Sequence, residues 1–207
     1  MTSSGPVWVI GAGGQGKVVI DTLIAAGLEV AGVLDGDASR NGGTVLGVKV
    51  HAPFTDRLLK GLRVSCAVLA IGSNAARARL AQSIEGVEWV TVIHPAAQVA
   101  PSAVIGVGTA VFAGAVIQPD ARIGNHVIVN TSSSVDHDCI LGDYVHIAPG
   151  ARLAGQVSIR KGTLVGMGSS ILPGQSVGEW AIVCAGAVVN RSVPSNVTAI
   201  GMPAKWC

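Results

Sequence analysis

The chain has 207 residues, enough for one large domain or two small ones. Apolar residues make up 49% of the sequence but aromatic residues only 3%, so any core must be built almost wholly from Val, Ile, Leu and Ala. Charged residues amount to 13%, the net charge is +2, and Lys and Arg form no long run. This composition favours narrow, repetitive packing and argues against nucleic acid or an anionic membrane as the main partner.

The sequence has no segment typical of export or of a membrane span. No run approaches the ~18 consecutive apolar residues that cross a bilayer. The apolar run at 7–10 is too short for a signal peptide. Cysteines at positions 66, 139, 184 and 207 are scattered without a C-x-x-C pair. We therefore expect idle thiols in a reducing cytoplasm.

Residues 1–92 predict a small α/β domain in which strands and helices alternate. Strands are expected at 7–10, 30–34 and 67–71, and helices at 17–26 and 74–84. Gly27 follows the first helix, where a glycine commonly ends a helix. A β-α-β order of this kind indicates a small parallel sheet of the Rossmann-like type.

A glycine-rich loop follows the first predicted strand. Its sequence is a complete G-x-G-x-x-G: Gly11-Ala12-Gly13-Gly14-Gln15-Gly16. Asp35 stands nineteen residues after Gly16, at the end of the second strand. Such glycines let backbone amides approach a phosphate, and the acidic residue accepts ribose hydroxyls. The domain is half of a two-sided dinucleotide fold, so a nucleoside diphosphate fits it better than NAD; a purely structural glycine turn is the other interpretation.

A strict six-residue repeat occupies the rest of the chain. From Ile93 to Val189 every sixth residue is a branched aliphatic one, at seventeen positions without a slip. A mostly small residue, such as Ala97 or Ser133, follows four places after each. A helix has period 3.6 and a strand period 2, so neither explains a period of six. Three six-residue faces do form a triangular coil with these residues inside, and residues 93–207 therefore predict an all-β prism of stacked coils.

The hexads and the ending Gly201-Met202-Pro203-Ala204-Lys205 resemble the hexapeptide-repeat acyltransferases, whose fold is a left-handed parallel β-helix. The resemblance covers roughly residues 93–207. It implies acetyl-CoA as co-substrate and a homotrimer whose active sites lie in the clefts between neighbouring prisms.

With the front domain included, the chain resembles a subgroup that N-acetylates the 4-amino group of nucleotide-linked 4-amino-4,6-dideoxyhexoses. Sialic acid O-acetyltransferases share this layout and are the alternative. The resemblance implies that the front domain binds the nucleotide sugar, and the matching positions are Gly13, Gly14, Gln15, Asp35, Gly36 and Gly72. Many relatives carry His in place of Gln15, which puts that one contact in doubt. UDP, GDP and dTDP all stay open as the nucleotide.

His137 is the candidate general base. Residues 18 apart stack on successive coils, which places His137 between small or stiff residues at 119, 155 and 173. Acetyl transfer from a thioester to an amine needs a base, and a histidine suits this work when a carboxylate orients it. The resemblance implies that His137 is catalytic and that Asp138 is its acidic partner; Asp136 is a second acidic candidate.

A second histidine, His146, lies in an outward column with apolar residues at 128, 164 and 182. Such a stripe needs cover, either from a neighbouring subunit or from the pantetheine arm of CoA. The resemblance implies acetyl-CoA contacts at His146, Met167 and Ala185 or Gly186. Lys205 either meets a CoA phosphate or is a solvated terminal lysine.

Two other classes of function deserve comparison. Some β-helix enzymes bind zinc through three histidines, but His126, His137 and His146 could converge only across an interface. The nucleotide-binding loop would then have no purpose. A noncatalytic nucleotide-binding scaffold would not need the cluster of acidic residues around His137. We therefore expect an acetyltransferase that uses neither a metal nor NAD.

Overall fold

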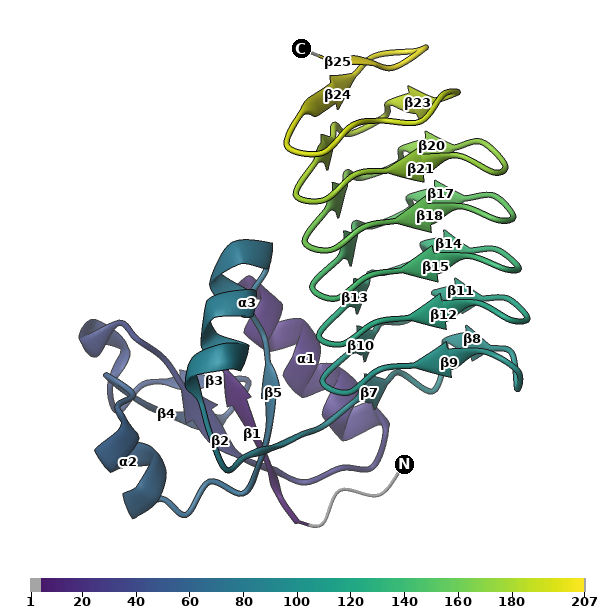
Figure 1. Ribbon diagram of the computed structural model, residues 1–207. Helices are drawn as coiled ribbons and strands as arrows, with labels where there is room; N and C mark the ends of the chain where they lie inside the picture. Colours follow the sequence, from purple (N-terminus) through teal and green to yellow (C-terminus); the bar gives the residue numbers. More distant parts are fainter. Residues whose placement is uncertain (1–4, 207) are drawn as a thin grey trace.

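The computed structural model describes residues 5–206. They form two parts that lie side by side, a small α/β part and a tall triangular prism (Figure 1). Residues 1–4 and Cys207 lie outside the described residues. Within residues 5–206, no helix combines the length and the apolar character that a membrane crossing requires.

The front part is one six-stranded sheet in the order β3-β4-β2-β1-β5-β6. Its strands are β1 (Val7–Ile10), β2 (Val30–Leu34), β3 (Thr44–Val45), β4 (Val48–His51), β5 (Cys66–Leu69) and β6 (Glu88–Trp89). Its helices are α1 (Gly14–Ala25), α2 (Asp56–Gly61) and α3 (Asn74–Ser83), with a 3-10 turn at Ala38–Arg40. All neighbouring strands are parallel except β3 and β4. The interior strand β5 is wholly buried, as its apolar sequence CAVL predicts.

The predicted α/β part is confirmed, with differences in detail. The strands expected at 7–10 and 30–34 have the expected bounds, and the third strand ends two residues earlier than expected. Helix α1 begins at Gly14 rather than at 17, because Gly13 already occupies the N-cap position in extended backbone. The short elements β3, β4 and α2 are additional, since their few residues carry no clear periodicity.

The prism consists of two-residue strands joined by four-residue turns. The strands are β7 (Val92–Ile93), β8 (Gln98–Val99), β9 (Val104–Ile105), β10 (Ala110–Val111), β11 (Val116–Ile117), β12 (Arg122–Ile123), β13 (Ile128–Val129), β14 (Ser134–Val135), β15 (Ile140–Leu141), β16 (His146–Ile147), β17 (Arg152–Leu153), β18 (Ser158–Ile159), β19 (Leu164–Val165), β20 (Ser170–Ile171), β21 (Ser176–Val177), β22 (Ile182–Val183) and β23 (Val188–Val189). Every third strand pairs in parallel to make three faces, so that Val111 pairs with Val129 and Val129 with Ile147. The strands β24 (Thr198–Ile200) and β25 (Lys205–Trp206) cap one face. The predicted parallel β-helix is confirmed.

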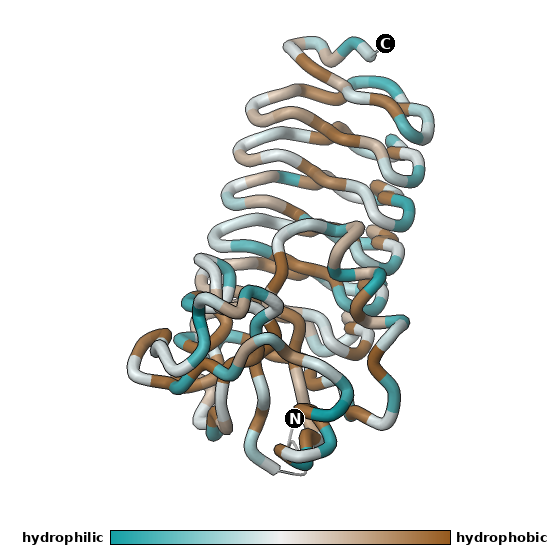
Figure 2. The backbone as a smooth tube through the Cα atoms, turned by 90° about the vertical axis from the view of Figure 1, so that its left-hand side faces the viewer, coloured by the Kyte–Doolittle hydropathy of each residue, from teal (hydrophilic) through white to brown (hydrophobic). Residues whose placement is uncertain are grey.

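The hexad residues form the core of this β-helix. From Val111 to Val189 every residue of the series is at most 4% exposed. The small residues four places later, such as Cys139, are buried with them. Figure 2 shows apolar residues recurring at the same place on successive coils. Strand pairing and side-chain stacking therefore share one register, set by the sequence period.

Helix α1 and the first prism face share one apolar cluster. Leu23 of α1 is buried together with Phe112 and Ile128 of the prism. The sequence predicts that a neighbouring subunit or CoA covers the outward column, and for Ile128 this prediction is wrong. Ile128 is 1% exposed because the front domain of its own chain covers it. Higher in the column, Leu164 is half-buried and Ile182 is 43% exposed.

A second, polar contact joins α3 to one corner of the prism. His126, Tyr144 and Gly162 occupy equivalent turn positions on successive coils, all with positive φ. Arg77 donates from Nε to the His126 oxygen and from Nη2 to the Tyr144 oxygen, both at 2.8 Å. Asn74 donates to the Gly162 oxygen at 3.0 Å. Helix α3 is thus bonded to the same backbone position on three coils.

Candidate active site

A pocket of about 940 Å³ opens at the carboxyl ends of β1, β2 and β5. In parallel α/β sheets, ligands bind at this edge. The walls come from the glycine loop, the segment after β2, and α3 with the loop before it. All six residues expected to bind the nucleotide sugar line it: Gly13, Gly14, Gln15, Asp35, Gly36 and Gly72. The structure therefore brings the complete predicted set together.

The glycines of the loop have different tasks. Gly11 has φ +120°, and a Cβ there would lie 2.6 Å from the Ala70 carbonyl oxygen. A Cβ on Gly16 would collide with the Gly11 carbonyl oxygen. At Gly13 and Gly14, by contrast, no described atom lies within 4 Å of the Cβ position, and both residues face the pocket. The outer glycines shape the loop, while the middle pair leave the N-terminus of α1 open to an anion.

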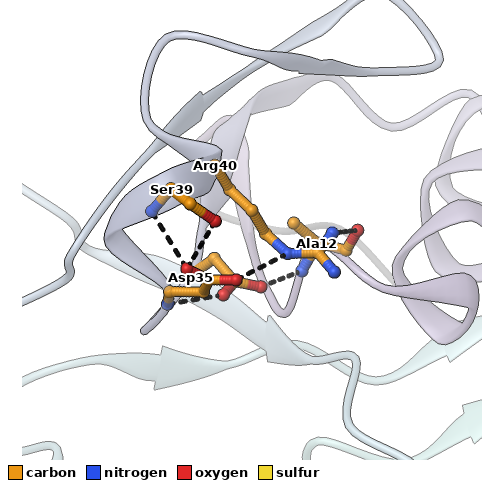
Figure 3. A network of polar contacts seen from close by, with 5 residues as sticks. Ala12, Asp35, Ser39 and Arg40 are labelled. Carbon is orange, nitrogen blue, oxygen red and sulfur yellow. Dashed lines mark hydrogen bonds and ion pairs between the residues drawn. The ribbon is translucent and has the colours of Figure 1, made fainter.

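Asp35 fastens the glycine loop to the end of β2 (Figure 3). Its Oδ2 accepts the Ala12 N–H at 2.7 Å, and its Oδ1 accepts the Asp37 N–H at 2.8 Å. Arg40 completes the network by donating from Nη1 to the Ala12 carbonyl at 2.9 Å. Each carboxylate oxygen keeps a second lone pair, so Asp35 can accept a ribose hydroxyl while it holds the loop.

Three polar groups of the pocket wall add to its chemistry. Arg40 and Arg79 both line the pocket, and sequence reasoning missed them because no motif marks either residue. Two guanidinium groups suit a diphosphate, since each can donate two parallel hydrogen bonds. The amide nitrogen of Gln15 is buried without a hydrogen-bond partner among the described residues. That nitrogen remains a donor for an acceptor supplied from outside the chain.

His137 lies on the turn between β14 and β15, with a 55% exposed side chain. Its Nδ1 is 2.8 Å from Asp138 Oδ2, and this hydrogen bond is the main cause that raises the pKa of His137 above its ordinary value. Asp136 accepts the backbone N–H of His137 at 2.7 Å. A Cβ on Gly155 would lie 2.5 Å from Nε2, so a glycine one coil further on makes room for the ring. Asp138 thus engages Nδ1 and leaves Nε2 to exchange a proton with a substrate.

His146 has a different environment, on strand β16 beside the front domain. Its Nε2 lies 3.1 Å from Asn130 Nδ2, and Asn130 Oδ1 accepts the Thr131 N–H at 2.8 Å, which fixes the orientation of the amide. Burial and, second, the charge of Arg77 lower the pKa of His146 to about 4. A hydrogen bond between the His146 ring and the backbone of Gly72 acts in the opposite direction. His146 is therefore neutral near pH 7 and touches the wall of the nucleotide pocket.

The other residues expected to bind acetyl-CoA lie above His146. Met167 and Ala185 stand 18 residues apart at the same corner of successive coils, and Gly186 follows Ala185. All three are exposed, Met167 by 59%. Lys205 is exposed in β25, at the top of the face to which β16 belongs. These residues border one continuous edge of the prism.

The structure does not bring His137 to the nucleotide pocket of the same chain. The pocket lies between α3 and the front sheet, on one side of the prism. The turn between β14 and β15 lies on the opposite side (Figure 1). The two halves of the predicted site therefore face away from each other within one chain.

The three histidines considered for zinc also lie apart. The His126 ring packs between Trp89 and Tyr144, with ring centroids 5.1 and 5.5 Å away. Burial lowers its pKa to about 4. His137 lies at a different corner, and His146 on a strand. Within residues 5–206 no group of three or more His, Cys, Asp or Glu side chains has an arrangement that would hold a metal ion.

Known proteins resemble both parts of the chain. The PglD N-terminal domain model matches residues 6–84, and the bacterial transferase hexapeptide model (six repeats) matches residues 120–155. GDP-perosamine N-acetyltransferase from Escherichia coli O157:H7 is 38% identical over 144 residues, which cover 66% of this chain and 65% of the relative.

Solved structures match almost the whole chain. One is a histidine-to-asparagine mutant of perosamine N-acetyltransferase from Caulobacter crescentus in complex with CoA and GDP-perosamine, with TM-score 0.92 and 41% identity over 99% of this chain and 98% of that chain. Another is the acetyltransferase domain of PglB from Neisseria gonorrhoeae in complex with acetyl coenzyme A, with TM-score 0.90 and 37% identity over 99% and 100%. The family resemblance seen in the hexads is confirmed. The chain belongs to the hexapeptide-repeat acyltransferases, in the subgroup of acetyl-CoA-dependent N-acetyltransferases that act on nucleotide-linked amino sugars.

Proposed function

We propose that this enzyme transfers the acetyl group of acetyl-CoA to the 4-amino group of a GDP-linked 4-amino-4,6-dideoxyhexose. The observation that carries the proposal is the pairing of a nucleotide-sized pocket with a carboxylate-oriented histidine on a hexapeptide-repeat prism. The choice of GDP follows the two perosamine N-acetyltransferase relatives, one named for GDP-perosamine and one in complex with it.

The two parts of the chain divide the work in this proposal. Residues 1–92 hold the nucleotide sugar, with its diphosphate at the N-terminus of α1 beside Gly13 and Gly14. Arg40 and Arg79 balance the phosphate charge, and Asp35 accepts a ribose hydroxyl. The sugar then extends past Gly72 toward the prism.

Residues 93–207 hold acetyl-CoA along the prism edge. The arm runs past Met167, Ala185 and Gly186, and His146 lies at its acetyl end. Lys205 stands four strands above β16 on the same face, about 19 Å at the usual strand spacing, where it meets a phosphate of CoA. His146 and Lys205 lie on the prism face that the front domain partly covers, and Met167, Ala185 and Gly186 lie on the turns that follow its strands.

We also propose a homotrimer, because His137 faces away from the pocket of its own chain. In a ring of three prisms, His137 of the partner subunit would reach the sugar amine held by the first subunit. The exposed apolar residues Ile182 and Met167 would be covered in the same cleft. A cytoplasmic location agrees with Cys139 and Cys184, neither of which is in a disulfide.

The chemistry follows from the state of His137. Its neutral Nε2 takes a proton from the amine as the nitrogen attacks the thioester carbonyl carbon. Asp138 stabilises the resulting imidazolium and keeps Nδ1 protonated. When the tetrahedral intermediate collapses, the C–S bond breaks, the imidazolium returns its proton to the sulfur, and CoA leaves as a thiol. The C–N bond of the amide remains in the product.

A substrate panel tests the proposed function directly. Purified enzyme, acetyl-CoA and 4-amino-4,6-dideoxyhexoses linked to GDP, UDP or dTDP are incubated together, and thiol release is followed. We expect the GDP-linked sugar to give the highest kcat/KM, because the two perosamine N-acetyltransferase relatives are named for or bound to GDP-perosamine. Turnover of sialic acid hydroxyls with no turnover of any amino sugar would replace N-acetylation by O-acetylation.

Replacing His137 removes the base and leaves both ligand pockets intact. For His137→Ala we expect kcat to fall by about 10² to 10⁴, the usual contribution of general-base catalysis. Calorimetric binding of CoA and of the nucleotide sugar should change little. His137→Asn should be similarly poor, since an amide takes no proton near neutral pH. A variant that keeps half of the wild-type kcat would move the base to another residue.

The pH dependence of kcat/KM tests whether Asp138 raises the pKa of His137. Because Asp138 raises the pKa of His137, wild-type activity should fall on the acid side at a pH above the ordinary histidine value of 6.5. Asp138→Asn removes the negative partner, lowers the pKa of His137, and should move the acid limb to lower pH. The amine of the substrate also titrates, but it is the same for every variant. The measurement is therefore the difference in kcat/KM between variants from pH 5.5 to 9. Asp56→Asn, on helix α2, is the control and should keep the wild-type limb.

The open glycines test the nucleotide pocket. Gly14→Val adds a side chain where the chain leaves room and the pocket begins. We expect the KM for the nucleotide sugar to rise by roughly tenfold or more, the factor that corresponds to about 1.4 kcal/mol, with the KM for acetyl-CoA nearly unchanged. Gly61→Val is a matched control, since Gly61 ends helix α2 with open space around it and lies outside the pocket. Equal rises in both KM values would argue against a pocket for the sugar nucleotide alone.

A further inference from the structure

Arg77 is a buried cation that the proposed chemistry does not use. Its side chain is 1% exposed, and no carboxylate pairs with it among the described residues. Burial lowers its pKa only to about 10, so it stays charged at neutral pH. Taking a charge out of water is expensive unless its hydrogen bonds are all made. The position of Arg77 therefore calls for a specific structural reason.

All three guanidinium nitrogens of Arg77 donate, and their acceptors belong to two groups. Toward the prism, Nε and Nη2 reach the carbonyl oxygens of His126 and Tyr144, with Val145 at 3.3 Å. Toward the pocket, Nη1 donates to the carbonyl oxygen of Ile71 at 2.9 Å and lies 3.4 Å from that of Gly72. Nη2 also donates to Asn74 Oδ1 at 3.0 Å. One rigid, planar group thus holds the loop before α3 and two coils of the prism at fixed separation.

The loop held by Arg77 is part of the nucleotide pocket. Ile71 and Gly72 both line it, and the backbone of Gly72 is hydrogen-bonded to the imidazole of His146 on the prism. A small rotation of the front domain about this corner would move a bound sugar relative to the acetyl group. Misplacement of reacting atoms by about 1 Å can lower a rate by 10² without any change in the reacting groups. The planar fork of an arginine resists such a rotation better than apolar packing, which tolerates sliding.

We propose that Arg77 is a positioning residue, which fixes the nucleotide-sugar pocket to the β-helix so that the sugar amine reaches the acetyl group. This inference rests on the proposed function. It assigns Arg77 no contact with either substrate. Replacing Arg77 should lower the rate of acetyl transfer only for substrates whose nucleotide is bound in the front pocket.

The test compares a tethered with an untethered acceptor. Enzyme with Arg77→Met is assayed with the nucleotide-linked 4-amino sugar and, at high concentration, with the same 4-amino sugar lacking its nucleotide. We expect kcat for the nucleotide-linked sugar to fall about 10²-fold per folded molecule, with both KM values within about threefold. The slow turnover of the free sugar should stay within about twofold of wild type, because it does not depend on the front pocket. Equal losses with both acceptors, or no loss with either, would overturn the proposal.

Two further variants separate positioning from simple loss of stability. Arg77→Lys keeps the charge but not the fork, so it should fold and show an intermediate kcat for the nucleotide-linked sugar; if Arg77→Met does not fold, this variant decides. Arg57→Met, at an exposed site on α2, is the matched control and should behave like wild type with both acceptors. A lysine variant with wild-type kcat would contradict the need for the fork.

A measurement without substrate separates this proposal from the proposed function. Amide hydrogen exchange at 71–77 should accelerate in Arg77→Lys relative to Arg57→Met, because the two parts of the chain open at this corner. Unchanged exchange at residues 71–77 would overturn the proposal that Arg77 fixes the pocket to the prism, whatever substrate the enzyme acetylates. If wild-type enzyme acetylates no nucleotide-linked sugar, the proposed function fails, and the exchange result still decides whether Arg77 fixes the pocket to the prism.

Discussion

Residues 18 apart lie in hydrogen-bonded register on successive coils, and this constraint governs the rest of the molecule. The core follows from it, because each inward residue stacks on its equivalents. The residues that stack at the corners of the prism follow from this register too. Gly155 lies over His137, one coil away, and the turn carbonyls at 126, 144 and 162 form the row that α3 contacts. A single period therefore builds the core, makes room for the His137 ring and forms the row of carbonyls to which the front domain binds.

Three of the prism histidines, His126, His137 and His146, illustrate how position decides protonation. His137 is exposed beside a carboxylate, so its pKa is raised. His126 is buried and His146 half-buried, both near the guanidinium of Arg77, and desolvation followed by that charge lowers the pKa of each to about 4. Near neutral pH the His126 and His146 rings are neutral polar groups at the domain junction, and of these three only His137 can change its charge. Burial at the junction, with the charge of Arg77 as the second cause, thus keeps these two histidines out of acid–base chemistry.

Strong local patterns carried most of what could be predicted. The hexads fixed the phase of every coil, and from that phase the exposure of His137 and its stacking against Gly155 follow. The glycine loop and Asp35 were equally readable, because they form a motif with known geometry. Arg77 was not, since it sits in a helix beside the similar Arg79, and only long-range folding buries one and opens the other to the pocket. The cover over Ile128 was missed for the same reason, because it comes from α1, about a hundred residues earlier in the chain.

The stacking of coils has a consequence for how such a chain can change length. Inserting or deleting one whole coil above Gly162 would keep every column aligned and shift the capping strands by about 4.8 Å along the axis. A change that is not a whole number of coils would turn the columns above it onto a different face. The height of the prism can therefore change only in steps of one coil if its columns are to stay aligned. Under the proposed function, the length of the prism between β16 and Lys205 would set which extended co-substrates can span from the acetyl end to the cap.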